Sequence, residues 1–449
     1  HNTAIGHKAL SANTTAHSNT AVGADALLAN TTGANNVAIG YGALDANTTA
    51  GSNNAIGYNA LGSNTTGQYN TALGHASLQA NTTADGNVGI GTFALWNNTT
   101  GASNTAVGAL GALEANTTGS NNTALGYNSL TANTTGTQNT ALGQGAAQSN
   151  ISGVYNVALG SDSLRDNTTA NWNVAVGTNA LLLNTTGASN VAIGGLALDA
   201  NTTASNNTAV GYASLGTNTT GSSNTVMGVN VMLVNTTGSN NVAMGTQSLD
   251  ANTTANNNTA LGWKALTANT TGASNAAVGH QAGYTNITGT QNVFLGANAR
   301  GTNNSVTVAN VIGYNVQGAA GYTTLGTGVN DIRAANGTAS WATVSDERYK
   351  KNIQDSTAGL SFINALQPRT FKYKTLGELP ETFSAYEADS TEVFKNSDTN
   401  HGFIAQEIKA AIDADSSIAD GFKLWDDRED GSQEVAEAAL IPILVKAIQ

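Results

Sequence analysis

Hydrophobic and polar positions along the first 300 residues follow a pattern that returns almost every seventeen residues. Each copy approximates Asn-Thr-Ala-(Ile/Val/Leu)-Gly-x-x-Ala-Leu-x-x-Asn-Thr-Thr-Gly-x-x, and its first glycines are Gly6, Gly23 and Gly40. One inserted residue precedes Gly126, and the seventeen-residue step then continues to Gly296. Such strict repetition is typical of one small structural unit stacked on copies of itself.

Within each copy, the alternation of side chains predicts β-strands. In the pentad 36–40, alternation places Val37 and Ile39 on one face, and Asn, Ala and Gly on the other. We expect the Val37 and Ile39 face to fill a thin apolar interior, opposite the leucine of each Ala-Leu pair, such as Leu44. Gly-rich and Asn-Thr-Thr-Gly segments would make two turns because Gly and Asn tolerate positive φ. The prediction is a mainly β protein whose shaft is a parallel β-roll, with two strands of about five residues in each coil.

This interior buries little apolar area per residue, because each coil offers one aliphatic pair and one leucine. We therefore expect another face of the coil to be buried as well. The smooth Ala/Gly/Asn face would let another backbone approach closely. The pattern predicts that several chains associate along this face, without fixing their number.

The repeat carries a family resemblance. The pentad 36–40 resembles the head repeats of trimeric autotransporter adhesins, and the seventeen-residue form is similar to repeats in phage tail fibres. The repeat here is longer than the adhesin repeat. The resemblance covers residues 1–300 and implies a homotrimer built on a left-handed parallel β-roll.

The Asn-Thr-Thr marker runs from Asn13 to Asn269 and is softened at residues 150–152 and 286–288. Turn chemistry favours an Asn cap followed by stacked Thr side chains. Two alternatives stay open: exposed Thr hydroxyls could form an ice-binding or glycan-binding face, and every copy also fits the Asn-x-Ser/Thr glycosylation pattern. Because adjacent Thr residues point to opposite faces, at most one Thr column can be exposed.

Aromatic residues occupy variable turn positions of the repeat. We favour ordinary turn packing for them, and stacking against sugars is the alternative. These residues are Tyr41, Tyr58, Tyr69, Trp96, Tyr127, Tyr155, Trp172, Tyr212 and Trp263.

Charge divides the chain into two regions. Only four of the 16 basic residues and eight of the 28 acidic residues lie in residues 1–300. The net charge of −12 and the absence of a basic cluster argue against a nucleic-acid partner. With no cysteine and isolated histidines, we expect neither a metal nor a cofactor. No apolar run approaches the ~18 residues of a membrane span, so we expect no membrane insertion.

The repeat decays over residues 301–343, and a mixed region occupies residues 344–449. Apolar spacing there predicts helices near residues 360–366, 403–412 and 435–448, and a strand at residues 370–374. By pattern alone, Ser345-Asp346-Glu347 is an amino-terminal helix cap. Because the chain starts inside a repeat and stops inside a predicted helix, we expect it to be cut from a longer one.

Four motifs follow in order, at residues 345–353, 366–373, 401–407 and 439–448. This series resembles the intramolecular chaperone and self-cleaving domain at the ends of phage tailspikes, tail fibres and endosialidases. The resemblance implies cleavage between Ser345 and Asp346, with Ser345 as nucleophile, Lys350 as general base and a further role for His401. A lysine accepts a proton only when neutral, which requires burial or a cationic neighbour.

Together these patterns predict a trimeric phage tail fibre, located on the virion and outside the cell, that attaches to a host surface. Its partner would be a host glycan or another receptor. The C-terminal domain would drive trimerisation and then cleave itself in a single turnover, with no metabolic activity expected. The alternatives are a bacterial trimeric surface adhesin and a solenoid whose Thr ladder binds ice or glycan.

Overall fold

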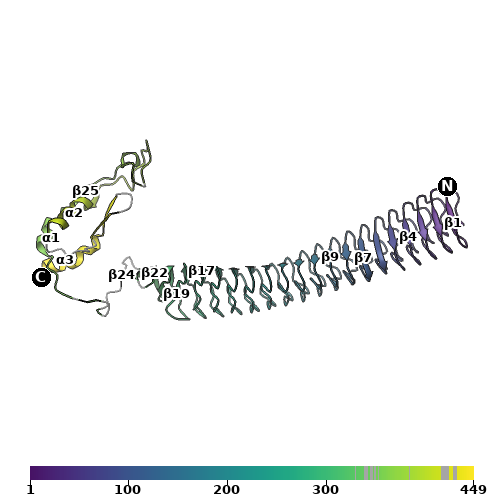
Figure 1. The fold of residues 1–449 in the computed structure, drawn as a ribbon, viewed down its shortest axis with the longest axis horizontal. Coiled ribbons are helices and arrows are strands. Elements are labelled where there is room, and N and C mark those ends of the chain that lie inside the picture. Colours follow the sequence, from purple (N-terminus) through teal and green to yellow (C-terminus); the bar gives the residue numbers. More distant parts are fainter. Residues whose placement is uncertain are drawn as a thin grey trace. The chain divides into compact units, whose positions relative to one another are not determined.

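The computed structural model describes residues 1–328, 330–337, 342–343, 347, 350–351, 353–383, 385–415, 424–427 and 432–449. The chain forms two compact units, His1–Val344 and Ser345–Gln449. We call the first unit the shaft and the second unit the C-terminal unit. Figure 1 shows the coils of the shaft stacked one after another from β1 onward.

The shaft is a parallel β-solenoid with 19 stacked strands, which confirms the predicted fold class. Each strand pairs in register with the strand one coil away, so that Val37 lies opposite Thr20 on one side and Asn54 on the other. An inserted residue widens the step to 18 between Thr105 and Thr123, next to a register shift in the preceding pair of strands. The stacked strands are β1 (Thr3–Ile5), β2 (Thr20–Val22), β3 (Val37–Ile39), β4 (Asn54–Ile56), β5 (Thr71–Leu73), β6 (Val88–Thr92), β7 (Thr105–Leu110), β8 (Thr123–Leu125), β9 (Thr140–Leu142), β10 (Val157–Leu159), β11 (Val174–Val176), β12 (Val191–Ile193), β13 (Thr208–Val210), β14 (Thr225–Met227), β15 (Val242–Met244), β16 (Thr259–Leu261), β17 (Ala276–Val278), β18 (Val293–Leu295) and β20 (Asn310–Tyr314).

A typical coil contains one strand of three residues, so the expected second strand was wrong. The return segment of the coil runs as tight turns because Gly42 and Leu44 both adopt positive φ, at 60° and 53°. It still bonds to its neighbour, since the amide of Leu44 donates to the carbonyl of Ala60 at 3.1 Å. A left-handed leucine costs about 1–2 kcal/mol. Full burial of its side chain contributes about 1.5–3 kcal/mol, which offsets that cost.

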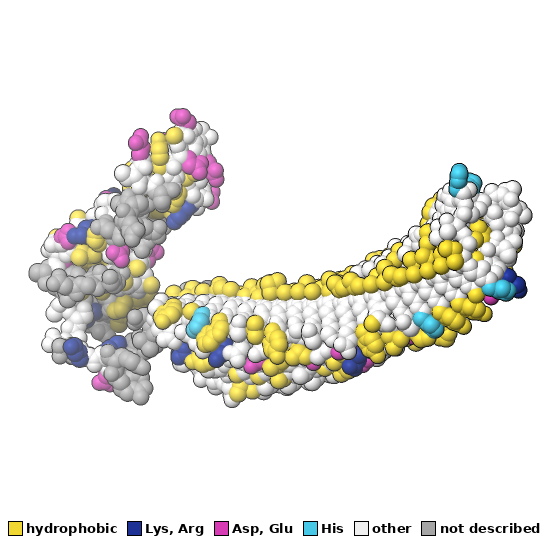
Figure 2. Space-filling view, turned by 45° about the vertical axis from the view of Figure 1, so that its right-hand side comes forward, with side chains coloured by type: hydrophobic (Ala, Val, Ile, Leu, Met, Phe, Trp, Pro, Cys, Tyr) yellow, Lys and Arg dark blue, Asp and Glu magenta, His cyan; other side chains and the backbone are white. Residues whose placement is uncertain are grey.

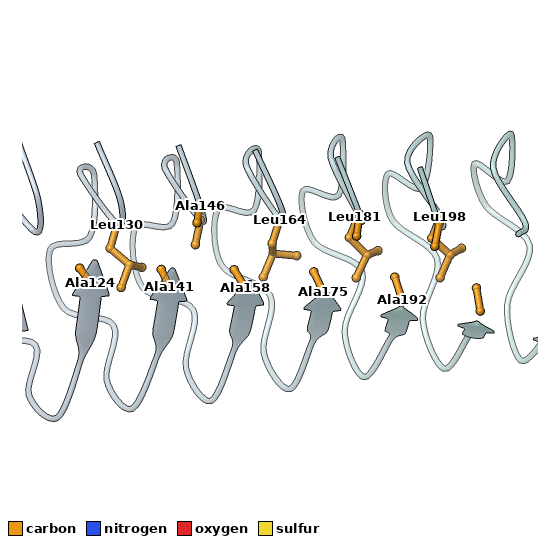
Figure 3. Close-up of a cluster of buried hydrophobic side chains, with 14 of the residues drawn as sticks. Ala124, Leu130, Ala141, Ala146, Ala158, Leu164, Ala175, Leu181, Ala192 and Leu198 are labelled. Carbon is orange, nitrogen blue, oxygen red and sulfur yellow. The ribbon is translucent and has the colours of Figure 1, made fainter. Parts of the chain in front are cut away.

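The interior of the coil faces the opposite way from the prediction. Ala38 is fully buried, whereas Val37 is half-buried and Ile39 is exposed. Figure 3 shows the reason, because each strand turns an alanine toward the leucine or alanine of the return segment across a narrow gap. The Ala/Gly/Asn face is therefore the core of a single chain, and it is not available to meet another chain.

Two columns of buried asparagine line this core. In one column, the Asn36 amide nitrogen donates to the carbonyl of Ala50 at 2.9 Å, and its side-chain oxygen accepts from the backbone amide of Asn53 at 3.0 Å. In the other, Asn47 donates to the side-chain oxygen of Asn30 at 2.9 Å and to the same Ala50 carbonyl at 3.0 Å. Buried polar groups need such partners, so these ladders join each coil to the next.

Beyond β18, the stack changes character. A two-stranded pair forms from β19 (Arg300–Gly301) and β21 (Gln317–Gly318). The strand β22 (Tyr322–Thr327) extends the main stack in parallel to β20. The strands β23 (Asn330–Ala335) and β24 (Ala342–Thr343) then add antiparallel partners.

The C-terminal unit mixes short helices and strands around a small apolar core. The core includes Phe362, Ile408, Leu424, Leu440 and Ile443. The predicted helices are found at three places, although the last is shorter and begins beside Pro442, a residue suited to a first helical turn. The elements are α1 (Leu360–Ala365), β25 (Arg369–Phe371), the 3-10 helix η2 (Leu376–Glu378), β26 (Asn400–Gly402), α2 (Ala405–Ala414), β27 (Trp425–Asp427), β28 (Gln433–Val435), the 3-10 helix η3 (Glu437–Leu440) and α3 (Ile441–Ile448).

Candidate functional site

The predicted cleavage site lies at the junction of the two units. Ser345 is the first residue of the C-terminal unit, although Ser345 and Asp346 themselves lie outside the described residues. Just beyond them, the carbonyl of Glu347 accepts a hydrogen bond from the backbone amide of Lys350 at 2.9 Å.

The Lys350 side chain is exposed in the single chain. The family resemblance assigns it the role of general base, which calls for burial or a cationic neighbour. The single chain therefore does not provide the burial of Lys350 that the role of general base calls for.

His401 lies on β26, where it pairs with Thr370 of β25 in an antiparallel ladder. Its side chain is exposed. This ladder brings the motif at residues 366–373 against the motif at residues 401–407. The structure thus joins these two motifs, while the roles of Lys350 and His401 in cleavage stay predictions.

A bidentate ion pair fixes the start of α2 against β25. The Arg369 guanidinium donates to both carboxylate oxygens of Glu407, at 2.9 and 2.8 Å. The bond from Arg369 lowers the pKa of the Glu407 carboxyl and raises the pKa of the guanidinium. Because both side chains are solvated, the pair orients the two elements more than it stabilises them.

One face of α3 is apolar and exposed. Ile443 and Leu440 face the core, while the opposite side carries hydrophobic residues spaced three, four and seven positions apart. This spacing produces a single stripe on a helix. We call it the α3 stripe, and it consists of Ile441, Leu444, Val445 and Ile448.

A second apolar line follows the strands of the shaft. The third residue of the short strands points outward, and in many coils it is a large hydrophobic residue that is 37% to 48% exposed. Figure 2 shows a nearly unbroken line of hydrophobic side chains along the shaft. Exposed apolar patches of such extent mark interaction surfaces in soluble proteins. We call this line the shaft stripe; beyond the terminal coil with Ile5, its exposed members are Ile39, Ile56, Leu73, Leu125, Leu142, Ile193, Met227, Met244, Val278 and Leu295.

Sequence reasoning missed the shaft stripe because it placed these side chains inside. The available signal was the residue type on the other face. The small Ala38, and Asn36 two positions before it, match a close-packed interior that Ile39 would overfill.

The fold shows where each residue of the Asn-Thr-Thr marker lies. Asn47 is buried and caps its turn, which confirms the favoured interpretation and leaves its amide inaccessible to a glycosylating enzyme in the folded coil. The first Thr donates along the stack, as Thr48 does to the carbonyl of Thr65 at 3.3 Å. The second Thr, such as Thr49, is exposed. One Thr column is therefore open to solvent, as the alternation predicted.

Among the described residues, no group of histidine, cysteine or carboxylate side chains is arranged to hold a metal ion. Within the same residues, no helix has the length and apolar character needed to cross a bilayer.

Comparison with known protein families gives a match within the C-terminal unit. Residues 345–415 match the family model described as the chaperone of endosialidase. No curated protein and no solved structure matches the chain. The protein thus combines a β-solenoid shaft with a C-terminal segment similar to the endosialidase chaperone.

Proposed function

We propose that this chain forms a homotrimeric fibre of a phage tail, which attaches to a host surface through its shaft. In this proposal, the C-terminal unit aligns three chains and then cleaves itself between Ser345 and Asp346. The observation that carries the proposal is the match of residues 345–415 to the endosialidase chaperone, directly after a solenoid shaft. A bacterial surface adhesin with the same shaft remains the alternative.

The two exposed apolar stripes support association of the chain with its own copies. The shaft stripe repeats at the coil spacing, so it could meet the same stripe on a copy running alongside it. The α3 stripe offers a second seam, because helices with apolar residues at positions such as Ile441, Leu444 and Ile448 bury them against one another. We therefore assign the contact between chains to the outward strand face, in place of the Ala/Gly/Asn face.

The repeat itself explains why a shaft of this kind needs a chaperone. Every coil resembles the next, so three chains that meet one coil out of register lose few of their contacts. A clamp at one end fixes the register before the coils associate. Removal of that clamp then prevents the chains from separating and realigning, so the fibre becomes kinetically stable.

Self-cleavage would follow assembly. In this proposal Lys350 accepts the proton of the Ser345 hydroxyl, whose oxygen attacks the carbonyl carbon of the Ser345–Asp346 peptide bond. The C–N bond breaks as Lys350 returns the proton to the leaving nitrogen of Asp346, and one water molecule then hydrolyses the ester that has formed. The products are a carboxylate at Ser345 and an amino group at Asp346. Since Lys350 is exposed in the single chain, contact with the other chains would supply its burial.

The experiment that tests the proposal is expression of residues 1–449 followed by mass measurement. The wild type should yield a trimeric shaft that ends at Ser345 and a fragment that begins at Asp346. The Ser345→Ala variant should remain whole and trimeric. A monomeric product would refute the fibre, and a wild type that stays whole would refute the self-cleavage.

A further inference from the structure

Five aromatic residues gather on one turn edge of the shaft. Tyr41, Tyr58 and His75 each directly follow the glycine that ends a strand, and the coil repeat stacks them above one another. Phe93 and Trp96 continue the same file in the next coil. We call this file the aromatic ridge.

The rings of the aromatic ridge stack along the shaft and remain partly exposed. The ring centroids of Tyr41 and Tyr58 lie 5.4 Å apart at 13°, and those of Tyr58 and His75 lie 5.2 Å apart at 7°. Tyr41 is 52% exposed, Tyr58 50% and Trp96 36%.

The fold does not require aromatic residues at this turn. The coils further along carry Gln144, Ser161 and Thr178 after the equivalent glycines, and they stack with the same strand register. The turn therefore closes equally well without an aromatic residue, although aromatic residues return at the same position further along, at Tyr127, Tyr212 and Trp263.

The chemistry of the ridge fits a carbohydrate. A single file of partly exposed rings offers apolar surface to the C–H groups of sugar rings. Beside it, the Trp96 indole donates to the side-chain oxygen of Gln79 at 2.8 Å, which places an amide where sugar hydroxyls can bond. A protein partner would need a broad patch of ~800 Å², which a single file of rings does not provide.

Charge near the ridge favours a neutral ligand. The ridge itself contains no lysine or arginine; Lys8 lies about two repeats before Tyr41, and the carboxylate residue Asp45 follows Tyr41 by four positions. An anionic glycan is held best by lysine or arginine partners, which the ridge does not contain. We propose that the aromatic ridge binds a neutral, linear oligosaccharide that lies along the shaft. This inference rests on the proposed attachment function and names the class of its receptor.

The test uses the trimer obtained by expressing residues 1–449, with three neutral hexasaccharides, cellohexaose, maltohexaose and mannohexaose, and with 3′-sialyllactose as an anionic comparison. Binding is measured by calorimetry and by tryptophan fluorescence. At least one neutral hexasaccharide should bind saturably, and Tyr58→Ala should weaken that binding by about tenfold. The Tyr58→Phe variant, which keeps the ring, should bind like the wild type.

The matched control is Trp172→Ala. Trp172 is also exposed and stacks on Tyr155 at 4.0 Å, but it lies outside the ridge. Its loss should leave binding unchanged. Absence of saturable binding to all three neutral sugars, preference for the sialylated sugar, or equal binding by Tyr58→Ala and the wild type would each overturn the inference. A trimer that cleaves normally but binds no sugar would refute the ridge proposal alone, whereas a monomeric product would refute the proposed function.

Discussion

At the residue scale, the coil glycine lets two backbones approach more closely than any side chain permits. Gly194 has a φ of 132°, and a Cβ atom placed on it would lie 2.6 Å from the carbonyl oxygen of Gly211 in the next coil. Because of both the positive φ and the short contact, an L side chain at this position would strain the backbone. The same glycine recurs at each coil because the same approach recurs.

We therefore expect Gly194→Ala to destabilise the shaft by about 1–3 kcal/mol or more. The neighbouring Gly195 is a matched control, because its φ is not in the left-handed region and its nearest neighbour would lie 3.7 Å from a new Cβ. Gly195→Ala should unfold like the wild type. Urea unfolding followed by circular dichroism distinguishes the two, and equal midpoints would contradict the close-approach argument.

The asparagine ladders make a second prediction at this scale. Asn98 is buried, donates to Asn81 and to the carbonyl of Gly101, and accepts from Asn116 at 2.7 Å. Asn98→Ala removes three buried hydrogen bonds and takes the donor from the side-chain oxygen of Asn81, which should cost about 1–3 kcal/mol. Its sequence neighbour Asn97 is exposed, so Asn97→Ala should change the free energy of unfolding by less than about 0.5 kcal/mol. Comparable losses in both variants would show that the ladder is not what stabilises the coil.

At the element scale, the strand alternation was predictable but its inward face was not. The sequence shows correctly that Val37 and Ile39 share a face, because side chains on a strand alternate. The assumption that larger apolar residues lie inside then chose the wrong face. In most coils the inward strand position holds an alanine, such as Ala38, and only a few coils bury a larger side chain there, such as Phe294.

The candidate site was predicted only by resemblance. Nothing in the local pattern around Lys350 or His401 distinguishes a catalytic residue from a solvated one, and the structure leaves both side chains exposed. Their catalytic roles were assigned because four motifs follow one another in the order typical of the family that the sequence resembles. The pairing of β25 with β26 could not be predicted, because the two segments are far apart in the sequence and the intervening loop has no strong pattern.

The ion pair between β25 and α2 predicts a pH dependence. Arg369 lowers the pKa of Glu407 below its ordinary value of 4.5, so the pair contributes stability above that value and loses it as the pH falls through the lowered pKa. Glu407→Gln should therefore reduce hydrogen-exchange protection of β25 and β26 near neutral pH. The difference from the wild type should shrink in acid, where the wild-type carboxyl is protonated.

An exposed glutamate in the neighbouring loop, Glu381, provides the control for this variant. Glu381→Gln should leave the protection of both strands unchanged at every pH. A Glu407→Gln effect that stays constant from neutral pH into acid would show that the ion pair is not its cause.

At the scale of the whole molecule, each chain has a core that closes within the chain and apolar stripes that stay exposed. The asparagine ladders and the alanine–leucine core complete each coil without help from another chain. The shaft stripe and the α3 stripe remain apolar and exposed. Folding of the coil and association of the chains should therefore be separable by mutation.

The pair Leu125→Lys and Leu142→Lys tests this separation. Both side chains are exposed in the single chain, so the coil should fold normally, whereas each association contact would bury an unpaired charge at a cost of several kcal/mol. After self-cleavage has removed the clamp, sedimentation should show folded monomers. In the Ser345→Ala background the retained clamp should keep the three chains together. Thr118→Lys and Thr135→Lys, on the exposed Thr column of the same coils, should leave the cleaved trimer intact. If the leucine variant instead sediments as a cleaved trimer, the chains associate through a different face, and the shaft stripe must be matched to another partner.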